Sequence, residues 1–162
     1  MKSDPLITYR RKPAKLDTKS LQIFAELLRD RVARGREFHC RITNDAELQH
    51  LNAQFLGHDY PTDVLSFPCQ PEARKTPVAA GARASSSELA LGDVAISLQR
   101  ARAQARQWRH ATEDELRILL LHGVLHLLGM DHETDSGKMR RAEMPWRREL
   151  GLPAGLIERA PQ

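Results

Sequence analysis

The sequence predicts an α+β domain, in which short strands and helices share one core. The 162-residue chain is 41% hydrophobic and 28% charged, the composition of an ordinary globular protein with enough residues for a real core. Short extended or alternating stretches typical of strands occur four times, and stretches suited to helices occur about five times. We therefore expect residues 1–162 to form a single domain of four strands and about five helices.

The first 43 residues predict a strand, a helix and a second strand. Residues 6–10 form a short extended run. A helix follows, with Asp17 or Thr18 able to cap its start. Its apolar face is formed by Leu21, Phe24, Leu28 and Val32. Residues 37–43 then alternate apolar and polar side chains, which indicates a half-buried strand with His39 on its polar side.

Residues 44–69 predict a second helix and a third strand. Asn44 and Glu47 have the spacing of a capping box, and Gly57 suits the end of the helix. The expected inner face of this helix is formed by Leu48, Leu51 and Phe55. Residues 63–68 are expected to form a strand closed by Pro68. Residues 70–88 are rich in Pro, Ala, Gly and Ser, and predict a long loop.

The fourth strand is expected at residues 89–97, with Gly92 at a bulge or a point of close backbone approach. A helix at 98–109 follows, and its apolar side is formed by Leu98, Ala101, Ala105 and Trp108. Beside them lies a basic stripe of Arg102, Arg106 and Arg109. Such a stripe is typical of a solvated helix face, and it could also contact phosphates.

Two further helices complete the chain. The helix expected at 112–128 starts with a capping-box pair, Thr112 and Glu115, and ends at Gly129. Its residues are almost all apolar beyond the first turn, so it must be buried. A last amphipathic helix starts near residue 135, and Pro145 is expected to kink or split it. Its apolar face is formed by Met139, Ala142 and Trp146.

Three histidines in the segment HGVLHLLGMDH, residues 122–132, have the spacing of a set of metal ligands. His122 and His126 are four residues apart on a helix, so both rings can reach one ion at about 2.0–2.1 Å. Gly129 permits a sharp turn that can bring His132 to the same ion. Burying two histidines in an apolar helix without a shared purpose is costly, so a metal site is favoured over a purely structural role. Three protein ligands leave one position open, as in catalytic zinc sites, although imidazole also suits other divalent transition metals.

Gly123 occupies the position where a zinc peptidase of the HExxH type carries its catalytic glutamate. Nothing else on the helix supplies a carboxylate, and Asp131 is better placed to orient a ligand histidine from outside the metal shell. Without a side chain at Gly123, the space beside the ion is expected to be open to a bulky anionic substrate. The spacing H-x3-H-x2-G-x2-H is nevertheless that of metzincin peptidases, so a metallopeptidase is kept as an alternative.

The same segment resembles the HGxLHLxGxDH signature of the YbeY family of bacterial rRNA-maturation endoribonucleases. PTDVLSFP (61–68) and LGDVAIS (91–97) resemble two other hallmark segments of that family, in the right order. The resemblance implies an α+β fold with a small mixed sheet, zinc bound by His122, His126 and His132, and cleavage of single-stranded RNA. It further implies a role in 16S rRNA 3′-end maturation and ribosome quality control, with ribosomal RNA or the small subunit as partner.

One position departs from the family pattern. Family members often have an arginine in a stretch such as YRGKDKPT, whereas this chain has FLGHDYPT with Leu56 in its place. The resemblance implies a phosphate contact for that arginine, so His58, Lys138 and the stripe at 102–109 are candidates to replace it. Ser66 and Lys138 are candidates for substrate binding. A non-catalytic ribosome-binding protein with a structural metal therefore stays a second alternative.

Composition bears on partners and location. A formal net charge of +4 and a pI of about 9.4 allow a nucleic-acid partner without requiring one. The longest apolar stretch is too short for a membrane span, and the N-terminus has no signal-peptide core. Cys40 and Cys69 form no CxxC pattern, and are expected to be small buried strand residues. We expect a cytoplasmic protein with no membrane partner and no DNA substrate.

Overall fold

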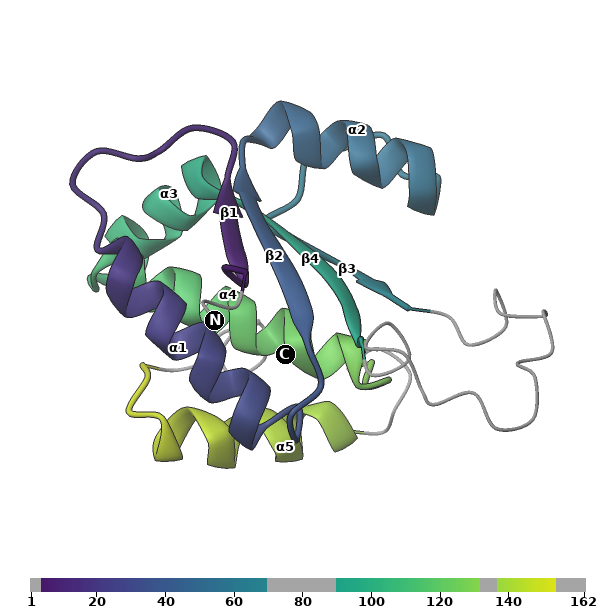
Figure 1. Ribbon diagram of the computed structural model, residues 1–162. Coiled ribbons are helices and arrows are strands. Elements are labelled where there is room, and N and C mark those ends of the chain that lie inside the picture. Colours follow the sequence, from purple (N-terminus) through teal and green to yellow (C-terminus); the bar gives the residue numbers. More distant parts are fainter. Residues whose placement is uncertain (1–3, 70–89, 132–136, 154–162) are drawn as a thin grey trace, which may run out of the picture.

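The computed structural model describes residues 4–69, 90–131 and 137–153 (Figure 1). In this part of the chain, four strands and five helices confirm the predicted α+β class. The elements are β1 (Ile7–Tyr9), α1 (Thr18–Arg31), β2 (Phe38–Thr43), α2 (Asp45–Leu56), β3 (Val64–Pro68), β4 (Gly92–Ser97), α3 (Leu98–Trp108), α4 (Thr112–Leu127) and α5 (Lys138–Glu149). The loop predicted at 70–88 lies outside the described residues.

The strands form one mixed sheet in the order β1-β2-β4-β3. Strands β1, β2 and β4 are parallel, and β3 pairs antiparallel with β4 at the edge. Because Thr43 pairs with Ser97, β2 and β4 end at the same edge of the sheet. The helices α2 and α3 start directly after these two strand ends. This edge therefore gathers the starts of two helices beside the carboxyl ends of three parallel strands.

The two faces of the sheet are covered differently. Alternate side chains such as Cys40 and Val94 point into the main core, which also contains Leu28 of α1 and Leu119 of α4. On the other face, Leu48 of α2 packs against a small cluster with Leu65 and Ala95. Figure 1 shows α2 apart from α1, α4 and α5. The predicted burial of the central helix is confirmed, since most residues of α4 are buried.

Several local predictions hold at the ends of the helices. Asp17 caps α1, and its carboxylate accepts a hydrogen bond from the Ser20 amide at 3.1 Å. Asn44 caps α2 in the same way, with the Glu47 amide as donor at 2.9 Å. Gly57 ends α2 in the left-handed conformation, at φ 73°. These signals succeed because each of them is confined to a few neighbouring residues.

Other local predictions are wrong. The N-cap of α4 is Ala111, and no side chain caps it. The buried Glu115 side chain instead forms a hydrogen bond with Nε2 of His110, so it is not available for a capping box. Phe55, expected on the inner face of α2, is 60% exposed because the small cluster beneath this helix ends before it. Helix α5 continues through Pro145, so the helix is not split there, while the kink that was the alternative expectation stays a prediction.

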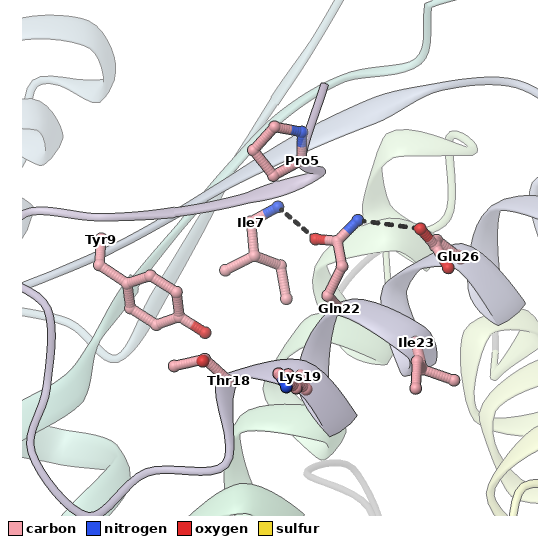
Figure 2. Close-up of a pocket in the computed structure, with 8 residues that line it drawn as sticks. All are labelled: Pro5, Ile7, Tyr9, Thr18, Lys19, Gln22, Ile23 and Glu26. Atoms are coloured by element: carbon pink, nitrogen blue, oxygen red, sulfur yellow. Dashed lines mark hydrogen bonds between the residues drawn. The ribbon is translucent and has the colours of Figure 1, made fainter. Parts of the chain in front are cut away.

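The outer edge of β1 borders a cavity of about 490 Å³ between this strand and α1 (Figure 2). Gln22 blocks part of the free strand edge, because its Oε1 accepts from the Ile7 amide at 3.2 Å and its Nε2 donates to Glu26. The Tyr9 hydroxyl is buried without a hydrogen bond to the described residues, and burial raises the pKa of Tyr9 to about 12. Gln22 therefore occupies part of a strand edge that would otherwise be free to pair with another strand.

None of the described helices is long and apolar enough to cross a membrane.

Candidate metal centre

His122 and His126 lie on consecutive turns of α4, as their spacing predicts. The His122 ring is buried, with the whole residue only 5% exposed, whereas His126 is partly exposed. The two Nε2 atoms lie 3.2 Å apart. Both imidazoles therefore direct the same nitrogen atom toward one point beside the helix.

The other ring nitrogen of His122 is bound from α5. Nδ1 of His122 lies 2.9 Å from Oε2 of Glu143, a side chain that is 1% exposed. A carboxylate in this position accepts the Nδ1 proton, which leaves the lone pair of the neutral ring on Nε2. Metal-binding histidines are commonly oriented by a carboxylate in this way. No local pattern marks Glu143 as a residue of the site, because it lies 21 residues from His122 in the sequence.

This arrangement fits a tetrahedral metal ion. Two nitrogens bound to one zinc ion at about 2.0–2.1 Å lie about 3.3–3.4 Å apart in tetrahedral geometry. The observed separation of 3.2 Å between the two Nε2 atoms is close to this value. The Glu143 contact selects the nitrogen that faces the partner histidine. These two features make His122 and His126 suitable as ligands of one ion.

The third predicted ligand, His132, lies outside the described residues. Within residues 4–69, 90–131 and 137–153, no group of three histidine, cysteine, aspartate or glutamate side chains is placed to hold a metal. A complete three-ligand site from this chain thus requires a residue beyond those ranges. Asp131 is partly buried, and its predicted role in orienting a ligand histidine stays a prediction.

The surroundings of Gly123 show that the expectation of open space for a bulky substrate at this position is wrong. A Cβ atom at Gly123 would lie 2.7 Å from Cγ1 of Val94 and 3.3 Å from the Ser66 hydroxyl. Val94 is fully buried, and the Ser66 hydroxyl donates to the Gly123 carbonyl at 2.9 Å. The missing side chain therefore allows α4 to pack closely on β3 and β4, and the space on that side is filled by protein.

The candidate substrate-binding residues occupy different places. Ser66 faces α4 from β3 through its bond to Gly123, while Lys138 is exposed at the first residue of α5. Leu56, at the position where the resemblance led us to expect an arginine, is the last residue of α2 and is 47% exposed. His58 lies two residues further along the chain, with its ring 5.4 Å from that of Tyr60. Their substrate contacts stay predictions.

The cysteines lie apart from this site. Cys40 is buried in β2, and burial raises the pKa of its thiol to about 12, so it stays protonated and unreactive. Cys69 is exposed just after β3, which corrects the expectation that both cysteines are buried. Neither forms a disulfide.

Comparison with known proteins places the chain in a family. The profile of the family described as Endoribonuclease YbeY matches residues 7–150. A protein of that name from Solibacter usitatus is 51% identical over 94% of this chain and 92% of its own length, and one from Sulfurovum sp. is 40% identical over 89% of each chain. A solution structure from Thermotoga maritima has a TM-score of 0.52 and 26% identity, and covers 89% of this chain and 88% of its own. The chain belongs to the endoribonuclease YbeY family.

Proposed function

We propose that this protein is a zinc-dependent endoribonuclease that cleaves single-stranded RNA, with His122, His126 and His132 as metal ligands. Its proposed role is maturation of the 3′ end of 16S rRNA and ribosome quality control in the cytoplasm. The observation that carries the proposal is the pair of Nε2 atoms 3.2 Å apart, with a buried carboxylate behind one ring. Membership of a family named for endoribonuclease activity supports the RNA substrate.

The side chains around the histidines prepare the site for this chemistry. When bound, a divalent ion would supply Lewis acidity toward a phosphate oxygen. Glu143 holds the Nδ1 proton of His122 and fixes the orientation of the ring from within the core. His126, which is partly exposed, lies on the side of the pair that substrate can approach. The protein thus presents one buried and one accessible ligand.

The packing of Gly123 argues against the metallopeptidase alternative. A peptidase of this type needs a carboxylate next to the first histidine to accept a proton during attack on the peptide bond. At Gly123 a Cβ atom has no room, because Val94 would lie 2.7 Å away. No observation in the described residues favours that second function.

The proposal predicts cleavage that depends on metal and on single-stranded substrate. Protein loaded with zinc is expected to cleave an unstructured RNA, to leave the same RNA intact when it is annealed to its complement, and to leave casein intact. Removing the metal with a chelator should stop cleavage, and added zinc should restore it. Gel electrophoresis of end-labelled RNA measures the result. Zinc-bound protein that leaves unstructured RNA intact would support the non-catalytic ribosome-binding alternative, and digestion of casein would support a peptidase.

Glu143 provides a second prediction. Replacing Glu143 with glutamine is expected to weaken zinc binding by about tenfold, because a neutral amide is a weaker acceptor for the Nδ1 proton of His122. Replacement with alanine should weaken it by up to about a hundredfold. Competition with a chromophoric chelator measures the affinity without any activity assay. Glu149→Gln is the matched control, because Glu149 is exposed on the same helix and pairs with Arg31. Equal zinc affinity in the Glu143 and Glu149 variants would exclude a role for Glu143 at the metal.

A further inference from the structure

A second site of interest lies at the edge where the parallel strands end. A cavity of about 350 Å³ opens there, and three of the residues that line it are arginines. Arg10 follows β1, Arg11 is the next residue, and Arg102 lies on α3. Thr43, Asn44 and Gln99 complete the polar part of the lining. We refer to this cavity as the arginine crevice.

The topology of the sheet places the crevice between two diverging helices. β2 leads into α2, which packs through Leu48 on one face, and β4 leads into α3, whose Ala101 belongs to the core on the other face. In open sheets with parallel strands, the carboxyl ends of adjacent strands whose connections go to opposite faces form a crevice that commonly binds ligands. The position of the crevice therefore follows from the topology of the sheet, and the crevice is not an incidental depression of the surface.

The positive charge of the crevice is largely uncompensated. Arg11 and Arg102 are exposed and form no hydrogen bond or ion pair with the part of the chain that the structure describes. Arg10 makes a long contact of 3.7 Å with Glu47. Guanidinium groups without a carboxylate partner are suited to bidentate contacts with phosphate.

The nearby acidic side chains already have partners. Glu47 accepts hydrogen bonds from Arg41, and this contact lowers the pKa of Glu47. The carboxylate of Asp45 accepts from the Ser97 hydroxyl and pairs with Arg100 at 3.3 Å. Because the closest partners of these acids are Arg41 and Arg100, only the long contact of Glu47 with Arg10 compensates charge in the crevice, and Arg11 and Arg102 have no acidic partner among the described residues.

The helix ends contribute less directly. The amides of Asp45 and Glu47 are bound by Gln99 and Asn44, and the Arg100 amide is bound by Ser97. These amides are therefore not free donors for a ligand. The arginines supply the donors, and the positive ends of the two helix dipoles add to the favourable potential for an anion.

We propose that the arginine crevice binds a backbone phosphate of the RNA substrate, at a distance from the histidine pair. This inference rests on the proposed function, because RNA is the polyanion that the histidine site is proposed to cleave. Figure 1 shows the strand ends at one edge of the sheet and the C-terminal end of α4 near the opposite edge. Contacts at both places would bind a segment of several nucleotides, of which only one linkage is cleaved. The crevice also gives a function to Arg102, which belongs to the basic stripe identified in the sequence.

The test compares two double variants with equal changes in charge. In Arg11→Gln/Arg102→Gln, both unpaired arginines of the crevice are removed. In the control, Arg34→Gln/Arg148→Gln, two exposed arginines outside the crevice are removed. Binding of a labelled, unstructured RNA oligonucleotide is measured by fluorescence anisotropy on protein stripped of metal, so that the RNA stays intact. Thermal melting checks that both variants are folded.

The crevice variant is expected to bind RNA about tenfold more weakly than the control, and its dependence of log affinity on log salt should be shallower by about 0.7, the value for one phosphate of a single strand. Equal affinities and salt dependences in the two variants would overturn the proposal.

A second experiment titrates both variants with inorganic pyrophosphate. If the crevice variant loses pyrophosphate binding but binds RNA like the control, the crevice serves a free phosphate ligand and the RNA proposal fails. The same RNA is then offered to zinc-loaded protein. If the crevice variant binds RNA more weakly and the wild type does not cleave it, the crevice proposal is supported and the proposed nuclease activity is contradicted. If the wild type cleaves the RNA and the two variants bind it equally, the nuclease activity is supported and the crevice proposal is contradicted.

Discussion

Replacing His126 with alanine is expected to abolish stoichiometric zinc binding and to reduce RNA cleavage by about a thousandfold or more. The Nε2 atom of His126 lies 3.2 Å from that of His122. The variant retains only one imidazole on α4, and one ligand from this helix binds an ion much more weakly than two. Loss of the ion removes several kcal/mol of stabilisation of charge in the transition state, and each 1.4 kcal/mol is about tenfold in rate. Inductively coupled plasma mass spectrometry measures the metal, and cleavage of labelled RNA measures the rate.

His126 is a better position for this test than His122. Because His126 is partly exposed, its removal leaves the core intact, whereas removal of His122 takes away a partner of the buried Glu143 carboxylate. His50→Ala is the matched control, since His50 is exposed on α2. His132→Ala should behave like His126→Ala if His132 is the third ligand. Undiminished cleavage by His126→Ala at unchanged metal content would contradict the proposed metal centre.

The largest effect on stability is expected at Gly92, the first residue of β4. In Gly92→Ala, the new Cβ would lie 2.2 Å from the Phe67 carbonyl oxygen and 2.9 Å from backbone atoms of Pro68 and Cys69, at a φ of +139°. Backbone atoms cannot move aside as a flexible side chain can, so the pairing of β3 with β4 must be disrupted. We expect a loss of about 4 kcal/mol or more in the free energy of unfolding, measured by urea denaturation.

Gly57→Ala separates the clash from the strain of a positive φ. Gly57 also has a positive φ, of 73°, but an added Cβ would have no atom within 4 Å. This variant is therefore expected to lose only about 1 kcal/mol, the usual cost of a left-handed conformation for alanine. If the two variants lose the same stability, the contact with β3 at Gly92 has no energetic importance.

The sequence allowed those features to be predicted that depend on neighbouring residues. The helical spacing of His122 and His126 is local, and the structure has both rings on one side of α4. Gly92 was expected at a point of close backbone approach, and its neighbours in β3 confirm this. Asn44 caps α2 as predicted for the same reason.

Features that depend on packing between distant segments could not be predicted. Glu143 is 21 residues from His122, and only the packing of α5 on α4 brings the two together. Glu115 had the spacing of a capping residue, but folding buries it against His110. The arginine crevice joins side chains from the end of β1 and from α3, which are neighbours only because β1, β2 and β4 end at one edge.

The close contact at Gly123 also restricts how this sequence can evolve. A glutamate there would complete the HExxH pattern of a peptidase, and a change of one codon position can turn a glycine codon into a glutamate codon. In this fold, however, the first carbon of that side chain would meet Val94, which is fully buried. Shortening Val94 first would leave a cavity in the core, so either order of the two changes passes through a destabilised protein. The contact between helix and sheet therefore separates the two chemistries by a barrier in folding stability, independent of any selection for RNA cleavage.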